Sequence, residues 1–152
     1  MASGKLAKDY IEGLNILSSM RMCANVPCQS AIQTALGGYQ SINDLVKDTG
    51  RLRIQRDVAV DMLNSIDGIH CVKPKGAMYC FARVDEKKFN INNDEQMILD
   101  LLRAEKILLV HGKAFNLTDG VYFRLVFLPH SDVLVPALHR IGNFFQHYQQ
   151  GA

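Results

Sequence analysis

The residue with the clearest chemical potential in this chain is Arg124, a lone arginine in a strongly apolar run. Every other residue from Val121 to Leu128 is apolar or aromatic. A guanidinium cannot lose its proton to escape burial, so it needs a partner or access to water. Its planar fork fits both oxygens of a carboxylate, so one interpretation is that Arg124 binds a ligand carboxylate. The alternatives are an internal salt bridge or a side chain that reaches solvent at the sheet edge.

The run around Arg124 is expected to form a strand over residues 121–128. Successive strand residues point to opposite faces, so Tyr122, Arg124, Val126 and Leu128 share one face. The remaining residues of the run share the opposite face. Because both faces are largely apolar, the pattern predicts that both faces of this strand are covered.

Two other segments contain residue types that suit ligand binding. In P-K-G-A-M-Y (74–79), Gly76 provides backbone that a ligand can approach, although a hairpin turn explains the same residues. In C-A-N-V-P-C-Q (23–29), Asn25 stands before an expected helix, and a helix cap explains it without any function.

Helical periodicity dominates the first third of the chain. Apolar residues recur at helical spacing from Leu6 to Met20, and Pro27 suits the first turn of a second helix that ends near Leu36. A short helix is expected at residues 41–44 and a longer one at 50–66.

The pattern after residue 66 alternates between strands and helices. Strands are expected at 69–72, 77–84, 107–110 and 121–128, with helices from Asn93 and from Ser131 or Asp132 to about Tyr148. The predicted fold class is therefore α+β, an α/β sandwich with a small sheet of about four strands and helices packed on it. Residues 1–48 form a leading helical segment, and residues 49–152 form the domain.

Composition excludes several classes of partner. The 152 residues are 48% hydrophobic and 21% charged, and 17 basic and 15 acidic residues leave a net charge of +2. This balance predicts no nucleic-acid partner, and the absence of an apolar run of about 18 residues predicts no membrane span. The four cysteines show no C-x-x-C or zinc-ligand spacing, so we expect reduced thiols, no metal and a cytoplasmic location.

Four segments together resemble one enzyme family. They are R-M-C-A-N-V-P-C-Q-S-A-I-Q-T-A-L-G-G (21–38), K-P-K-G-A-M-Y-C-F (73–81), I-L-L-V-H-G-K-A-F-N (107–116) and Y-F-R-L-V-F-L-P (122–129). The chain resembles fold-type I pyridoxal-phosphate aminotransferases, and more narrowly the bacterial alanine aminotransferases, also called glutamate–pyruvate transaminases. The similarity runs from about Ser3 to Gln149 and matches only the C-terminal part of those enzymes, which contains the small domain.

The resemblance assigns a role to each candidate residue. It places the arginine that grips the α-carboxylate of amino-acid and 2-oxo-acid substrates at Arg124, and the glycine of the turn before the strand at Gly76. It places Asn25 near the active site and close to the interface of a homodimer. His111 would either line the same cleft or be a partly exposed loop histidine.

One departure from the family limits what this chain does alone. The family's cofactor-binding lysine has no counterpart here, because Ser3-Gly4-Lys5 leads directly into a helix. We therefore expect no catalytic or cofactor-binding residue in this chain, no bound pyridoxal phosphate, and no activity in isolation. The full-length parent would transfer amino groups between alanine and 2-oxoglutarate. The alternative is a stand-alone module for small-carboxylate binding or dimerisation, without catalysis.

Overall fold

The computed structural model describes residues 7–151, which divide into two compact units between Ser41 and Ile42. Leu6, expected at the start of the first helix, and Lys5 lie outside the described residues. The predicted division between residues 48 and 49 stays a prediction.

The first unit contains two helices, α1 (Lys8–Met20) and α2 (Val26–Gly37). The segment between them interrupts the helical path where the sequence predicts it. Asn25 ends this segment, and its side-chain oxygen accepts a hydrogen bond from the Cys28 N–H at 3.1 Å. Neither helix has a buried residue. Most of their large apolar side chains are exposed, and Ile11 is half-buried.

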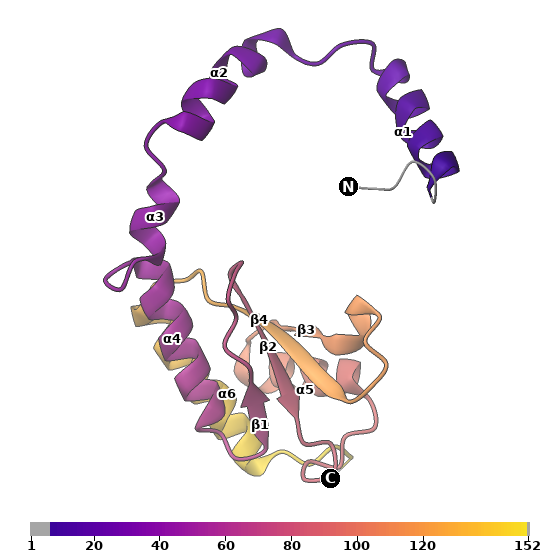
Figure 1. The fold of residues 1–152 in the computed structure, drawn as a ribbon. Coiled ribbons are helices and arrows are strands. Elements are labelled where there is room, and N and C mark those ends of the chain that lie inside the picture. Colours follow the sequence, from indigo (N-terminus) through magenta and orange to yellow (C-terminus); the bar gives the residue numbers. More distant parts are fainter. Residues whose placement is uncertain (1–6, 152) are drawn as a thin grey trace. The chain divides into compact units, whose positions relative to one another are not determined.

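The second unit has the predicted order of strands and helices (Figure 1). After the short helix α3 (Ser41–Val46) at the boundary between the units, the elements are α4 (Arg51–Asn64), β1 (Ile69–Cys71), β2 (Tyr79–Val84), α5 (Asp94–Glu105), β3 (Val110–His111), the 3-10 turn η1 (Gly112–Phe115), β4 (Val121–Val126) and α6 (Ser131–His147). This arrangement confirms the α+β fold class.

The four strands form one antiparallel sheet in the order β1-β2-β4-β3. Arg124 lies in an inner strand, β4, and its backbone pairs with Phe81 of β2 and with Val110 of β3. Because β4 is paired on both sides, the backbone that carries Arg124 is held more firmly than an edge strand would be.

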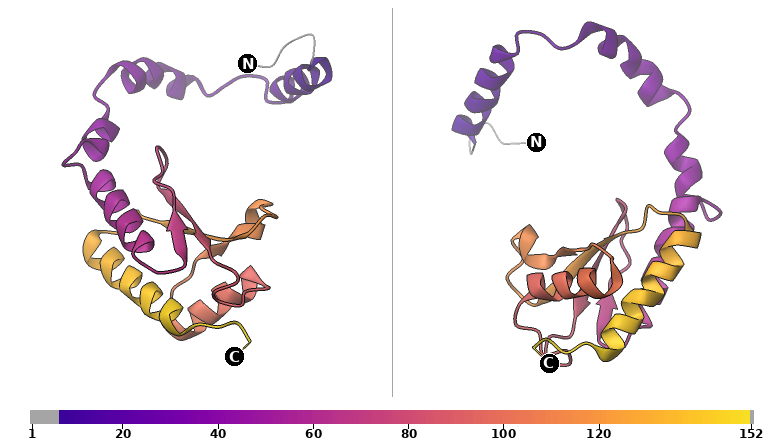
Figure 2. Two further views of the ribbon diagram at one scale, coloured as in Figure 1. Left: turned by 60° about the horizontal axis from the view of Figure 1, so that its bottom comes forward. Right: turned by 180° about the vertical axis from the view of Figure 1, so that it is seen from behind.

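Helices α4, α5 and α6 cover one face of the sheet (Figure 2). The core between sheet and helices contains Ala59, Leu63, Cys80, Ala82, Met97, Leu101, Phe123, Leu125, Leu138, Ile141 and Phe145. On the other face, Tyr79, Val126 and Leu128 are 40%, 37% and 44% exposed. The prediction that both faces of β4 are covered is therefore wrong for the described chain, because its second unit has helices on one face only.

Two local predictions also need correction. The strand expected at residues 107–110 is reduced to Val110 and His111. Lys106 ends α5 in the left-handed conformation, with φ 55°, and the apolar residues that follow do not pair with β4. At the start of α6 the capping position is His130, without a side-chain cap bond, rather than Ser131 or Asp132.

A buried glutamine fixes the chain where it leaves β4. Gln55 of α4 is 1% exposed, and its Nε2 donates to the carbonyl oxygens of Phe127 and Leu128 at 2.9 Å each, and to that of Pro129. Arg51, one helical turn earlier, also donates to the Leu128 carbonyl at 3.0 Å. These bonds join α4 to the end of the strand that carries Arg124.

We predict that Gln55→Leu lowers the free energy of unfolding by about 1–3 kcal/mol, because buried carbonyl oxygens lose their donor while side-chain volume is kept. Urea denaturation followed by circular dichroism measures the change. Gln146→Leu, at an exposed position of α6, is the matched control and should change stability by less than about 0.5 kcal/mol. A Gln55→Leu effect no larger than that of the control would contradict this role.

Candidate functional site

The Arg124 guanidinium lies between two aromatic rings. Its Cζ atom is 4.6 Å from the ring centroid of Tyr79 and 4.6 Å from that of Phe115. Tyr79 comes from β2 and Phe115 from η1, so two different elements fix the orientation of the cation. A guanidinium over a ring face is attracted by the ring quadrupole, by about 0.5–2 kcal/mol for each ring.

No carboxylate of the described chain compensates this charge. Arg124 forms no ion pair among residues 7–151, and its Nε atom is buried without a hydrogen-bond partner. The internal salt bridge considered from the sequence is therefore not found within these residues. A buried donor without a partner costs about 1–3 kcal/mol.

Four aromatic residues near Arg124, namely Tyr79, Phe81, Phe115 and Tyr122, are called the aromatic face here. The Phe81 ring stacks on Tyr122 at 5.4 Å between centroids and meets Phe115 edge-on at 5.7 Å. These residues stand on the face of the sheet that the helices leave open. Tyr79 and Phe115 are 40% and 41% exposed, so this face is open to water in the described chain.

An apolar pocket of about 270 Å³ lies beside this face, at the edge of the sheet near β3. It is lined by residues 107–110, by Arg124 to Val126, and by residues of the α6 segment. Arg124 is the one charged residue among the described residues that line it. One wall of the pocket comes from α6, on the covered side of the sheet, whereas the Arg124 side chain stands on the open face, so the pocket marks the edge of β4 rather than a cavity that holds the guanidinium.

Gly76 lies in the turn that leads into β2, three residues before Tyr79. A Cβ atom built at this position meets no atom within 4 Å, and the left-handed residue of the turn is Ala77, with φ 55°. Within the described chain, neither crowding nor backbone conformation requires a glycine here. The role of Gly76 in substrate binding stays a prediction.

Asn25 belongs to the first unit and caps α2, so the helix cap that the sequence predicts as an explanation of this residue is confirmed. Arg124 and Gly76 both belong to the second unit. A substrate-binding role for Asn25 therefore stays a prediction as well.

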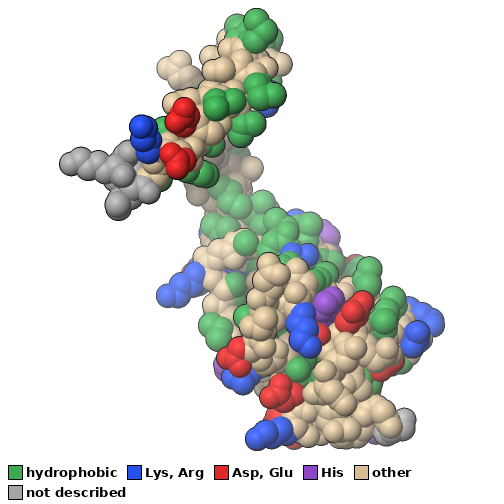
Figure 3. Space-filling model, turned by 90° about the vertical axis from the view of Figure 1, so that its right-hand side faces the viewer, with side chains coloured by type: hydrophobic (Ala, Val, Ile, Leu, Met, Phe, Trp, Pro, Cys, Tyr) green, Lys and Arg blue, Asp and Glu red, His purple; other side chains and the backbone are tan. Residues whose placement is uncertain are grey.

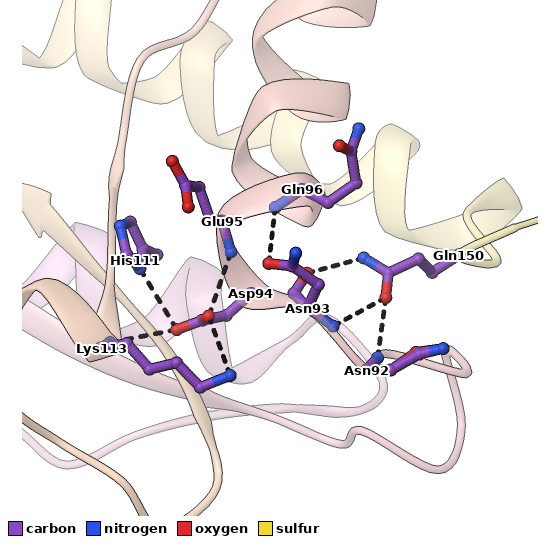
Figure 4. A network of polar contacts seen from close by, with 8 residues as sticks. All are labelled: Asn92, Asn93, Asp94, Glu95, Gln96, His111, Lys113 and Gln150. Carbon is purple, nitrogen blue, oxygen red and sulfur yellow. Dashed lines mark hydrogen bonds and ion pairs between the residues drawn. The ribbon is translucent and has the colours of Figure 1, made fainter.

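The sequence analysis missed a buried carboxylate behind β3 (Figure 4). Asp94, the first residue of α5, is 1% exposed. Its Oδ2 accepts from the Lys113 backbone N–H at 3.0 Å and lies 3.4 Å from His111 Nδ1, and its Oδ1 lies 3.4 Å from Lys113 Nζ. Burial alone would raise the pKa of the Asp94 carboxyl, but the Lys113 N–H bond and the charges of Lys113 and His111 outweigh burial and lower this pKa.

The same close-up shows a second buried side chain, Gln150, on the other side of the α5 start (Figure 4). Its Oε1 accepts from the backbone N–H groups of Asn92 and Asn93 at 2.7 and 2.9 Å, and its Nε2 donates to the Asn93 carbonyl at 2.7 Å. These bonds tie the end of the chain to the segment that begins α5. The first turn of α5, with Asp94, is thus held from two directions.

The described residues do not fit a pyridoxal phosphate site. The eight lysines among residues 7–151 are all exposed, whereas a lysine that forms a Schiff base is activated by desolvation or by a neighbouring cation. Residues 7–151 also contain no cluster of three or more side chains suited to hold a metal ion. None of the helices in this part of the chain is long and apolar enough to span a membrane. What the described site offers is an oriented, uncompensated guanidinium.

Comparison with known proteins identifies relatives that are much longer than this chain. It is 58% identical to the glutamate-pyruvate aminotransferase AlaA of Haemophilus influenzae over 144 residues. The matched residues are 95% of this chain and 36% of that relative. It is 52% identical over 144 residues to an alanine aminotransferase of Mycobacterium tuberculosis, covering 95% of this chain and 34% of the relative. The chain thus spans about a third of the length of the curated relatives it matches.

Solved structures and a family model agree with these relatives. A crystal structure of an aminotransferase from Escherichia coli superposes with a TM-score of 0.87 at 51% sequence identity, over 98% of this chain and 37% of that one. Residues 6–141 match the family model for aminotransferase class I and II. The resemblance inferred from the four sequence segments is thereby confirmed, and the chain belongs to the class I and II aminotransferase family.

Proposed function

We propose that the intact protein containing this chain is a pyridoxal-phosphate-dependent alanine aminotransferase that transfers amino groups between alanine and 2-oxoglutarate. Relatives at 52–58% identity carry the names glutamate-pyruvate aminotransferase and alanine aminotransferase, which supports this choice within the family. The observation that carries the proposal is the Arg124 guanidinium, which lies between two rings without a carboxylate partner among residues 7–151. All amino-acid and 2-oxo-acid substrates of such an enzyme share the α-carboxylate that Arg124 would bind.

The part of this chain in the reaction is to bind and orient that carboxylate. A hydrogen bond to a charged group contributes about 1.5–3 kcal/mol, so two bonds from one guanidinium hold a small substrate firmly. Because β4 and the two rings fix the guanidinium, a bound carboxylate also has a fixed direction, which is an orientation effect on the rest of the substrate. We place the residues that hold the cofactor in other parts of the intact protein, since no described lysine fits that role.

We also propose that the helices of the first unit lie at the interface of a homodimer. Large apolar side chains along α1 and α2 are exposed, and hydrophobic side chains are visible over the surface of this unit (Figure 3). Met20 and Leu36 are 76% and 78% exposed. An apolar surface of this kind is typical of an interface.

The four cysteines are free, which suits the cytoplasmic location that we propose for the protein.

The alternative function is a stand-alone module that binds small carboxylates without catalysis. An uncompensated guanidinium on an open face of the sheet would suit this function too. We expect calorimetric titration of the 152-residue chain with alanine, pyruvate and 2-oxoglutarate to give no saturable heat at millimolar ligand, because the open face is wet without the rest of the protein. Saturable binding to the isolated chain that Arg124→Lys abolishes would favour the module instead.

For the intact protein, we predict that Arg124→Lys raises KM for alanine and for 2-oxoglutarate and lowers kcat. A lysine is a point charge and cannot make two parallel bonds to a carboxylate. Loss of one charge-assisted bond reduces kcat/KM by about 10- to 100-fold. Arg140→Lys is the matched control, since Arg140 already pairs with Glu105 at 3.0 Å on the α6 surface. Steady-state kinetics with an unchanged kcat/KM for alanine would remove Arg124 from the site.

The dimer proposal predicts that two substitutions in α1, Leu14→Asp and Leu17→Asp, together shift the intact protein towards monomer. Both side chains are exposed within this chain, so the change should act on association rather than on folding. Analytical ultracentrifugation across micromolar concentrations measures the equilibrium. Leu108→Asp, at an exposed apolar position of the second unit, is the control. A wild-type protein that is monomeric at all these concentrations would rule out the interface.

A further inference from the structure

We propose that Asp94 is a positioning residue for Arg124, which acts through the turn η1 and the ring of Phe115. This inference rests on the proposed function, in which Arg124 binds the substrate carboxylate. It concerns a residue that lies on the covered side of the sheet and touches neither Arg124 nor the open face.

The first step is the attachment of η1 to α5. The buried Asp94 carboxylate accepts the Lys113 backbone N–H at 3.0 Å, so the second residue of η1 is bonded to the first residue of α5. Two further nitrogen atoms, His111 Nδ1 and Lys113 Nζ, each lie 3.4 Å from the carboxylate and come from β3 and from η1 itself. All three contacts hold the segment that leads from β3 into η1, as the close-up shows (Figure 4).

The second step is the rigidity of the turn itself. η1 is a single 3-10 turn followed by Asn116, which has the left-handed conformation with φ 58° and donates its N–H to the Lys113 carbonyl at 3.0 Å. At its start, Gly112 packs closely on β4, because a Cβ atom added there would lie 3.0 Å from Tyr122 Cβ. The backbone between Gly112 and Asn116 therefore has little freedom once Lys113 is anchored.

The third step is the contact of the turn with the guanidinium. Phe115 lies two residues after Lys113, and its ring centroid is 4.6 Å from Arg124 Cζ. The ring itself is 41% exposed, and its aromatic neighbour is Phe81, at 5.7 Å. The position of the Phe115 backbone limits which places the ring can reach, and its contacts with Phe81 and Arg124 select among them. Asp94 thus determines where one of the two rings beside Arg124 stands.

The charge of Asp94 suits this task. The combination of the Lys113 N–H bond and the neighbouring positive charges lowers the pKa of the carboxyl, so the group is ionised at neutral pH. An ionised carboxylate accepts stronger hydrogen bonds than an amide oxygen does. Asp94→Asn therefore keeps the shape of the side chain while it weakens the bond to the Lys113 N–H and removes the ion pair with Lys113 Nζ.

The test is a double-mutant cycle in the intact protein, with Asp94→Asn, Phe115→Leu and the two combined. We expect each single change to raise KM for alanine and 2-oxoglutarate about 3- to 10-fold, in the range of a cation–π contact, with a smaller effect on kcat. Because both changes act on the same contact, the KM values of the combined variant should be no higher than those of Phe115→Leu alone. Asp100→Asn is the matched control, since Asp100 lies on the same helix and binds Gln96 and Tyr148 instead.

Amide hydrogen exchange gives a readout that does not depend on activity. Asp94→Asn should speed exchange at Lys113 and Asn116, and Asp100→Asn should not. If Asp94→Asn does not fold, Asp94→Glu takes its place, because it keeps the charge and displaces the carboxylate by one methylene.

Three outcomes are decisive. A folded Asp94 variant with wild-type KM values overturns the inference, and so do effects that multiply in the combined variant. Failure of the proposed function has a different signature, in which Arg124→Lys leaves kcat/KM unchanged while exchange at Lys113 still responds to Asp94→Asn. In that case the link from Asp94 to η1 stands, but it does not serve carboxylate binding.

Discussion

The Arg124 guanidinium carries a charge that no carboxylate among residues 7–151 compensates, and the second unit is organised around the need to hold it. Burying such a cation without a partner costs free energy, and this cost is reduced here by placing it on the open face of the sheet between two rings. The inner position of β4 fixes its backbone, and the helices cover only the opposite face. The structure thus presents a cation that is held in place and still available to an anion.

The supports of this cation come from elements far apart in the sequence. Gln55 and Arg51 of α4 bind the carbonyl groups that follow β4, and thereby fix one end of the strand. Asp94 of α5 binds η1 and thereby fixes the turn that carries Phe115. In both supports a buried polar side chain, Gln55 or Asp94, makes its hydrogen bonds. Such a group specifies one geometry, because a buried polar group without its hydrogen bond costs free energy. The helices therefore cover the core and also position the groups on the far side of the sheet.

Much of this could be predicted from the sequence, and the reasons for the exceptions are physical. The alternation of β4 and the helical periodicities gave the order of elements, and Asn25 and Asn93 marked helix starts because their caps are local. Gln55 and Asp94 carried no comparable signal, since their partners are backbone groups distant along the chain. The pairing of Val110 and His111 was obscured by the neighbouring apolar residues, because a continuous apolar run has no period. Alternation also cannot tell whether the cover of an apolar face belongs to the same chain, which is why the open face was missed.

The most direct test of the account is the NMR signal of the Arg124 Nε–H group in the intact protein as propionate, a carboxylate without an amino group, is added. That Nε atom is buried and has no partner within residues 7–151, whereas Arg140 Nε already donates to Glu105 at 3.0 Å and serves as an internal reference. The account predicts a saturable shift of the Arg124 signal, with the Arg140 signal unchanged. An Arg124 signal that does not respond, or that moves only in parallel with Arg140, would contradict the claim that this guanidinium is the carboxylate-binding group.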